Sequence, residues 1–272
     1  MGKLDGRVAL ISGGGRGIGR CAALQLAREG AKVVVNDLDP GPAEDVINEI
    51  RSNGGEAVAC VGSVTDSDFP ERFIATALDT YDDLHIIINN AGYTWDAVIQ
   101  NMTEEQYDAM IEVHLKAPWR ILKEAAAVIR GKARAEVENG KRIVRKIVNI
   151  SSISGTRGNA GQTNYSSAKA GVAGLTRSLA REWGRYYVTV NCVAFGFIQT
   201  RLTEATDEKR IIEVGDKKVP IGVPVDNIRN IEASIPMGRA GTPDEAAGAI
   251  LLFCLPESDY ISGQVVEVTG GE

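Results

Sequence analysis

The amino-acid sequence predicts an α/β fold, in which a doubly wound parallel sheet of about seven strands is covered by helices on both faces. Two observations support this. Short apolar segments alternate with amphipathic helical segments along most of the 272 residues. The apolar segments also lack a polar face, which is typical of strands buried on both sides. Strand–helix alternation of this kind favours right-handed crossovers and a single domain over residues 1–272.

Each element is predicted from its local pattern. A run such as Val33-Val34-Val35 predicts a strand, and glycines such as Gly30 or Gly54 end the helices. The expected strands are residues 7–11, 32–36, 57–61, 84–88, 145–150, 188–193 and 264–268. The expected helices are residues 19–30, 43–53, 69–81, 103–130 (crossed by Pro118) and 164–184.

Residues 203–236 interrupt this alternation. The segment is polar, has no clear period and contains Pro220, Pro224 and Pro236. A long irregular insertion in a compact domain is usually functional or disordered. We therefore expect an irregular lid over the substrate side of the site.

Composition excludes several classes of function. The chain is 44% hydrophobic and 24% charged with a net charge of −6, and it has no basic stripe, which argues against nucleic acid. There is no apolar run of membrane-spanning length and no signal-peptide pattern, so we expect a cytoplasmic protein with no membrane partner. Four scattered cysteines and two histidines predict free thiols and no metal site.

Residues 12–19, Ser-Gly-Gly-Gly-Arg-Gly-Ile-Gly, lie between the first strand and the first helix. Glycines allow a sharp turn and bring a diphosphate close to bare backbone, and the helix N-terminus behind them attracts anions. A glycine-rich turn without a ligand is the alternative. The position directly after a buried strand favours a dinucleotide site.

Asp37 follows the second strand, about 20 residues after the loop, where an acid can bind the adenosine ribose hydroxyls. A carboxylate there repels the extra phosphate of NADP, so we favour NAD. Arg16 in the loop leaves NADP possible, because a cation can meet that phosphate. Alternatively, Asp37 is an ordinary turn residue and Arg16 is a solvated surface charge.

Tyr165 and Lys169 are four residues apart and so lie on one face of a helix. A nearby ammonium favours the phenolate and brings the tyrosine pKa closer to neutrality, which suits proton transfer. The same spacing is common in surface pairs. Here it follows a strand ending at Ser152, whose hydroxyl can bind the reacting oxygen.

These residues, together with Asn89-Asn90-Ala91-Gly92 and Phe195-Gly196, resemble the short-chain dehydrogenase/reductase family over nearly the whole chain. The resemblance implies a Rossmann-type domain, often a homotetramer or homodimer, that oxidises an alcohol or reduces a ketone with a nicotinamide cofactor. It implies Tyr165 as acid/base, Lys169 at the nicotinamide ribose and Ser152 at the substrate oxygen. The cofactor-binding residues implied are Ser12, Gly13, Gly15, Arg16, Gly17, Ile18, Gly19, Asp37, Ser63, Val64, Asn90, Ala91, Gly92, Tyr165, Lys169, Gly196, Ile198 and Thr200.

The sequence departs from the family pattern at several positions. His114 replaces the usual asparagine of the proton relay, and a histidine can titrate near neutral pH. We count it with the catalytic residues, and a buried structural histidine is the equal alternative. Phe195 replaces a proline, Ser12 a threonine and Ser63 an acid.

Finer likenesses concern the substrate. Residues 158–165 resemble both 3-oxoacyl-ACP reductases and the 3-hydroxyacyl-CoA dehydrogenase part of peroxisomal multifunctional enzymes, which act on acyl thioesters of fatty acid metabolism. Residues expected to line the substrate pocket are Ser154, Gln162, Trp95 and Phe197, although core packing explains the aromatics equally well. The sequence is also compatible with a dehydrogenase of a steroid, cyclic or aliphatic alcohol, with an epimerase or dehydratase, and with a non-catalytic NAD(H)-binding regulator.

Overall fold

A seven-stranded sheet forms the centre of the computed structural model, which describes residues 2–206, 210–215 and 217–272. The strand order is β3-β2-β1-β4-β5-β6-β9, and every neighbouring pair is parallel. The predicted doubly wound sheet is therefore confirmed. Its strands are β1 (Val8–Ile11), β2 (Lys32–Val35), β3 (Ala57–Ala59), β4 (Ile86–Asn89), β5 (Arg145–Ser152), β6 (Val188–Phe195) and β9 (Val265–Val268).

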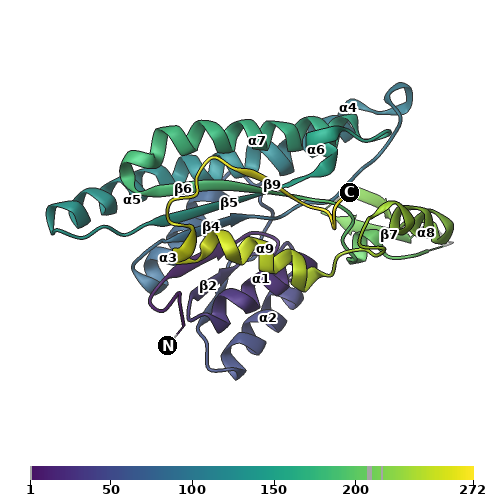
Figure 1. Cartoon of the computed structure of the whole chain (residues 1–272). Coiled ribbons are helices and arrows are strands. Elements are labelled where there is room, and N and C mark those ends of the chain that lie inside the picture. Colours follow the sequence, from purple (N-terminus) through teal and green to yellow (C-terminus); the bar gives the residue numbers. More distant parts are fainter. Residues whose placement is uncertain (1, 207–209, 216) are drawn as a thin grey trace.

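The helices cover both faces of this sheet (Figure 1). The longer ones are α1 (Gly17–Arg28), α2 (Pro40–Ser52), α3 (Phe69–Tyr81), α4 (Glu104–Ile111), α5 (Ala117–Glu138), α7 (Thr163–Trp183), α8 (Val225–Ser234) and α9 (Pro243–Cys254). The shorter ones are η1 (Ile99–Asn101), η2 (Glu112–Lys116), α6 (Ile153–Arg157), η3 (Gly184–Tyr186), η4 (Arg201–Thr203) and η5 (Pro256–Ser258). Across the described ranges, no helix combines the length and apolar character that crossing a membrane requires.

Alternate residues of each strand face opposite helix layers. Ile11 and Ile88 belong to a buried cluster with α1, α2 and α9, whereas Leu10 and Ile87 belong to a second cluster with α3, α5 and the π-helical turn η2. Successive side chains of a strand point to opposite faces, so a strand buried on both sides must be apolar throughout. This explains why apolar runs without alternation predicted these strands correctly.

The predicted helix over residues 103–130 is divided by η2, a single π-helical turn between α4 and α5. Pro118 occupies the second position of α5, where its missing N–H costs no hydrogen bond inside that helix. Turns of this kind often occur at functional sites. Here the turn buries Val113 and His114 against the centre of the protein.

The expectation that residues 203–236 are irregular is wrong for most of the segment. It contains an antiparallel hairpin, β7 (Arg210–Val214) with β8 (Lys217–Ile221), followed by α8. Gly215 adopts a φ of 61° at the hairpin turn. Pro220 hid this strand from the sequence pattern, but the hairpin is a separate two-stranded sheet, where proline is tolerated. Residues 207–209 and 216 lie outside the described residues.

Candidate active site

The glycine loop is fixed to the end of β4 by Ser12. The Ser12 hydroxyl oxygen accepts the N–H groups of Asn90 at 3.0 Å and Ala91 at 3.1 Å. The Asn90 side-chain amide donates in turn to the carbonyls of Ser12 and Gly13. A Cβ on Gly13 would lie 2.8 Å from the Ala91 Cα, so only glycine permits this approach. The sequence motifs at residues 12–19 and 89–92 thus form one structure.

The N-terminus of α1 suits a dinucleotide diphosphate. No side chain of the described residues caps it, and its first turn has no acidic residue. Gly17 has a φ of 54°, and a Cβ there would meet nothing nearer than the Thr200 side chain at 3.8 Å. Bare backbone and unpaired N–H groups at a positive dipole end are the features that hold phosphate. Gly196 and Ile198 follow β6 in the chain shortly before Thr200, and Ile198 is bridged to Gly241.

Asp37 lies directly behind this loop and is nearly buried. One carboxylate oxygen accepts the Gly15 N–H at 3.0 Å and the other the Asp39 N–H at 3.2 Å. The Arg16 guanidinium pairs with Asp39 at 2.8 Å and lies 3.9 Å from Asp37. Arg16 is therefore engaged by two carboxylates, which does not favour its use as a phosphate ligand.

Asn36 is a residue of the cofactor region that sequence reasoning missed. Its side-chain oxygen accepts the Gly13 N–H at 3.2 Å, and its amide donates to the carbonyls of Cys60 and Gly62 at 2.9 Å. It thereby joins the glycine loop to the ends of β2 and β3. Its position directly before Asp37 was the available signal. Beyond β3, the Ser63 hydroxyl bonds that of Thr65, and Val64 is buried in the core.

Ser152, Tyr165 and Lys169 come together at the carboxyl end of β5. Ser152 ends this strand and caps α6, accepting the Ser154 N–H at 3.1 Å. Lys169 is buried, and its ammonium lies 5.5 Å from the Tyr165 ring centroid while donating to the Ile150 carbonyl at 2.8 Å. Burial lowers the pKa of Lys169 to about 8.

The expected effect of Lys169 on the tyrosine is not what the structure shows. Burial raises the pKa of Tyr165 to about 12; the Ser152 hydroxyl lowers it, and the Asp96 charge adds to the rise. The Lys169 ammonium lies over the ring and donates to a carbonyl instead of to the Tyr165 hydroxyl. Desolvation therefore dominates the pKa of Tyr165. This raised pKa keeps the Tyr165 hydroxyl protonated at neutral pH, the form that can donate a proton.

His114 packs edge-on against Tyr165, with 4.9 Å between ring centroids and an interplanar angle of 89°. Its Nε2 lies 2.6 Å from the Tyr93 carbonyl, so this nitrogen carries the proton. Its Nδ1 is buried without a hydrogen-bond partner among the described residues. Burial and the charge of Lys169 hold the pKa of His114 well below its usual value. The expectation that it titrates near neutral pH is therefore wrong.

The four expected pocket residues are only partly assembled. The Ser154 hydroxyl donates to Gln162 at 2.8 Å, and its N–H donates to Ser152. Trp95 packs against the core cluster of α3 and α5, as expected if it serves core packing. Phe197 lies beyond β6, where its carbonyl accepts the Gly241 N–H at 3.0 Å. Sequence reasoning missed Asp96 and the fully buried Asn164, the neighbours of Trp95 and Tyr165.

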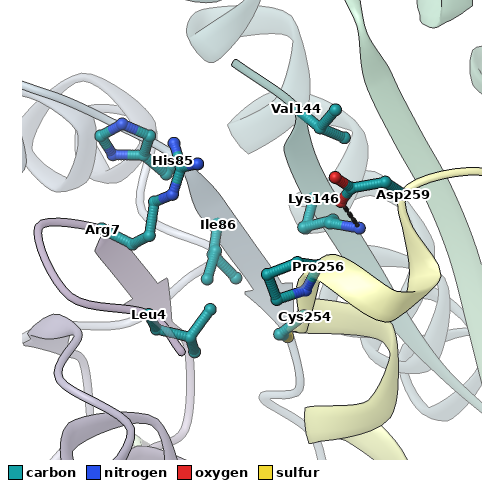
Figure 2. Close-up of a pocket in the computed structure, with 9 residues that line it drawn as sticks. All are labelled: Leu4, Arg7, His85, Ile86, Val144, Lys146, Cys254, Pro256 and Asp259. Atoms are coloured by element: carbon teal, nitrogen blue, oxygen red, sulfur yellow. Dashed lines mark ion pairs between the residues drawn. The ribbon is translucent and has the colours of Figure 1, made fainter. Parts of the chain in front are cut away.

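A small cavity lies at the opposite, amino-terminal edge of the strands, where Figure 2 shows the ion pair of Lys146 with Asp259 at 2.7 Å. Its volume is about 40 Å³. Its lining residues are Leu4, Arg7, His85, Ile86, Val144, Lys146, Cys254, Pro256 and Asp259. Ligand pockets are usually several hundred Å³, so this cavity does not hold the reaction.

The sheet, the bare glycine loop and the Ser–Tyr–Lys group define a nicotinamide-dependent oxidoreductase. The family model described as short chain dehydrogenase matches residues 7–211. A 3-oxoacyl-[acyl-carrier-protein] reductase of Synechocystis is 37% identical, covering 100% of this chain and 98% of the relative. A mouse (3R)-3-hydroxyacyl-CoA dehydrogenase is 36% identical, covering 99% and 97%.

A solved structure of a Serratia marcescens short-chain dehydrogenase/reductase mutant has a TM-score of 0.84, with 25% identity and coverage of 99% and 98%. The chain belongs to the short-chain dehydrogenase family. It is an oxidoreductase that interconverts an alcohol and a ketone with NAD or NADP.

Proposed function

We propose that this chain interconverts the 3-hydroxyl and 3-oxo groups of an acyl thioester with NAD(H). The observation that carries the chemistry is the grouping of Ser152, Tyr165 and Lys169 beside the glycine loop. Support for the substrate comes from the full-length relatives, which are named as a 3-oxoacyl-[acyl-carrier-protein] reductase and a (3R)-3-hydroxyacyl-CoA dehydrogenase.

The side chains have separate tasks in this reaction. A bound nicotinamide supplies or accepts the hydride. The Tyr165 hydroxyl gives its proton to the carbonyl oxygen during reduction and takes it back during oxidation. Ser152 donates a hydrogen bond to the same oxygen and lowers the cost of forming the Tyr165 phenolate. Lys169 binds the nicotinamide ribose. His114, as a neutral imidazole, offers Nδ1 as the acceptor of a proton relay.

Substrate comparison tests this function. We expect NADH oxidation with 3-oxobutanoyl thioesters at a higher kcat/KM than with cyclic or aliphatic ketones. A cyclic ketone turned over more efficiently would refute the thioester assignment. NADH binding, followed by fluorescence, without turnover of any of these compounds would instead indicate a non-catalytic NAD(H)-binding protein.

The cofactor preference is tested at Asp37. We expect the wild type to bind NADH more tightly than NADPH, and Asp37→Ala to reduce this discrimination roughly tenfold, since a charged hydrogen bond is lost. Removing the acid should also raise the affinity for NADPH, because the carboxylate no longer repels the extra phosphate. Damage to the loop would instead lower the affinity for both cofactors. Titration by fluorescence measures both, with Asp45→Ala on the exposed side of α2 as control. Tighter NADPH binding by the wild type would contradict the choice of NAD.

A homotetramer or homodimer is the proposed assembly. Support comes from exposed apolar side chains on or just before β9, the end strand of the sheet, namely Ile261 and Val266. The cytoplasm remains the proposed compartment, supported by the four cysteines, which are all free thiols.

A further inference from the structure

The loop after β4 is fastened to the start of the catalytic helix α7. The Ala97 N–H donates to the Gly161 carbonyl at 2.9 Å, and the buried Asn164 side chain donates to the Trp95 carbonyl at 3.0 Å. Asp96 lies between these two attachments. It is therefore held next to Gln162, the residue that precedes α7.

Four side chains form a hydrogen-bonded chain at this point. Gln162 Nε2 is 2.7 Å from an Asp96 carboxylate oxygen. Gln162 Oε1 accepts from the Ser154 hydroxyl at 2.8 Å and from the Asn159 amide at 3.0 Å. An ionised carboxylate can only accept, so Asp96 requires the amide nitrogen of Gln162 to face it. The amide oxygen must then face Ser154 and Asn159.

This fixed polarity determines what Ser154 can do. A serine hydroxyl has one proton, and that of Ser154 is used on Gln162. Toward any other partner, the Ser154 oxygen can only accept. Ser152, two residues earlier, accepts the Ser154 N–H and keeps its own proton for donation toward Tyr165 or the reacting oxygen. The site thus has a donor at Ser152 and a pure acceptor at Ser154.

We propose that Asp96 is a specificity-determining residue, which acts through Gln162 to make Ser154 an acceptor for an N–H or O–H donor of the substrate. The inference rests on the proposed function for the reacting centre. Two kinds of substrate carry such a donor near the reacting carbon. One is a thioester with an amide N–H in its thiol arm, and the other is a ketone with a neighbouring hydroxyl.

Kinetics with paired substrates tests the acceptor. The first pair is 3-oxobutanoyl-N-acetylcysteamine and an S-alkyl 3-oxobutanoyl thioester of equal length without the amide. The second pair is 3-hydroxybutan-2-one and butan-2-one. We expect the wild type to favour the donor-bearing member of one pair by about three- to tenfold in kcat/KM, the range of a single hydrogen bond. The pair that responds identifies the donor as N–H or O–H.

Variants of the chain separate polarity from structure. Ser154→Ala and Asp96→Asn should each bring the kcat/KM ratio of the two paired substrates toward one. The first variant removes the acceptor, and the second lets the Gln162 amide turn, so that Ser154 is no longer fixed as an acceptor. Asp96→Asn combined with Gln162→Glu should restore the ratio, since the amide then donates to the carboxylate and Ser154 again donates its proton. Asp108→Asn, an exposed acid on α4, is the matched control and should keep the ratio. Equal ratios in the wild type and Ser154→Ala would overturn the proposal.

A second measurement does not depend on turnover. Nitrogen-15 NMR of the Gln162 side-chain amide should show one Nε2 proton shifted by the carboxylate, and this shift should vanish in Asp96→Asn but persist in Asp108→Asn. An unshifted amide in the wild type would overturn the inference even if thioesters are reduced. A shifted amide without turnover of any ketone would overturn the proposed function and support the fixed polarity.

Discussion

Tyr165→Phe is expected to lower kcat by about 10²- to 10⁴-fold, the usual contribution of a positioned acid or base. Phenylalanine keeps the ring that packs against His114 at 4.9 Å and under the Lys169 ammonium at 5.5 Å. The substitution therefore removes the proton donor and little else. NADH affinity, measured by fluorescence titration, should stay within about twofold, because the ring packing beside the cofactor site is retained.

Ser152→Ala provides the comparison for this variant. It removes one hydrogen bond to the reacting oxygen, a loss of about 10²- to 10³-fold in kcat for a donor of this kind. Tyr165→Phe with wild-type turnover would exclude tyrosine as the proton donor. Loss of NADH binding in Tyr165→Phe would show that the hydroxyl acts in binding as well as in proton transfer.

Lys169→Met is expected to abolish turnover and at the same time stabilise the fold. Lys169 is only 4% exposed, and burial lowers its pKa from 10.5 to about 8. Keeping a charged lysine in this position costs about 3 kcal/mol at pH 7, at 1.36 kcal/mol per pKa unit. Losing the hydrogen bond to the Ile150 carbonyl costs the variant about 1 kcal/mol, so its net gain in stability is about 2 kcal/mol.

The pH dependence of this gain has a definite sign. The folded protein holds the Lys169 proton less tightly than the unfolded chain, so stability rises with pH between the two pKa values. The penalty in the wild type is fully present below about pH 8 and disappears as pH approaches 10.5. The stability advantage of Lys169→Met should therefore be largest near neutral pH and shrink above pH 8.

Denaturant unfolding at pH 7 and at pH 9.5 measures this effect. Lys146→Met is the matched control, because Lys146 is equally buried but pairs with Asp259 at 2.7 Å and donates to Ser258. Removing it leaves that acid without its partner, and no gain in stability is expected. A destabilised Lys169→Met protein at pH 7 would show that the lysine contributes more to packing than its charge costs.

The architecture was predictable from local pattern. Apolar runs such as 33–35 and 86–88 identify strands buried on both faces, and all seven strands of the central sheet lie within a few residues of their predicted positions. Glycines lie at or just after the ends of α1, α2 and α7, whereas α3 ends at Tyr81 before a left-handed Asp82. The family was predictable too, because the motifs that identify it can be seen in the sequence alone. They are the glycines at positions 13, 17 and 19 and the Tyr165–Lys169 spacing.

The hairpin at β7 and β8 was not predictable in this way. Its strands are short and one contains Pro220. Among the described residues they pair only with each other. Contacts outside the hairpin support it, including the backbone bond from Gly222 to the Leu202 carbonyl and the Lys217–Glu105 ion pair at 3.3 Å. A pattern in one segment holds no information about partners elsewhere in the chain.

The sequence by itself determined the sheet, the glycine loop and the side chains proposed as catalytic, because these depend on residue type and spacing within one segment. Only the tertiary structure decided their protonation and their neighbours. Burial moved the pKa of Tyr165 up and that of His114 down, and both shifts depend on residues distant in the chain. The link from Asp96 to Ser154 arises likewise, because folding brings the loop after β4 to the start of α7. Desolvation and hydrogen-bond polarity are properties of the assembled site, and they arise only when these segments meet.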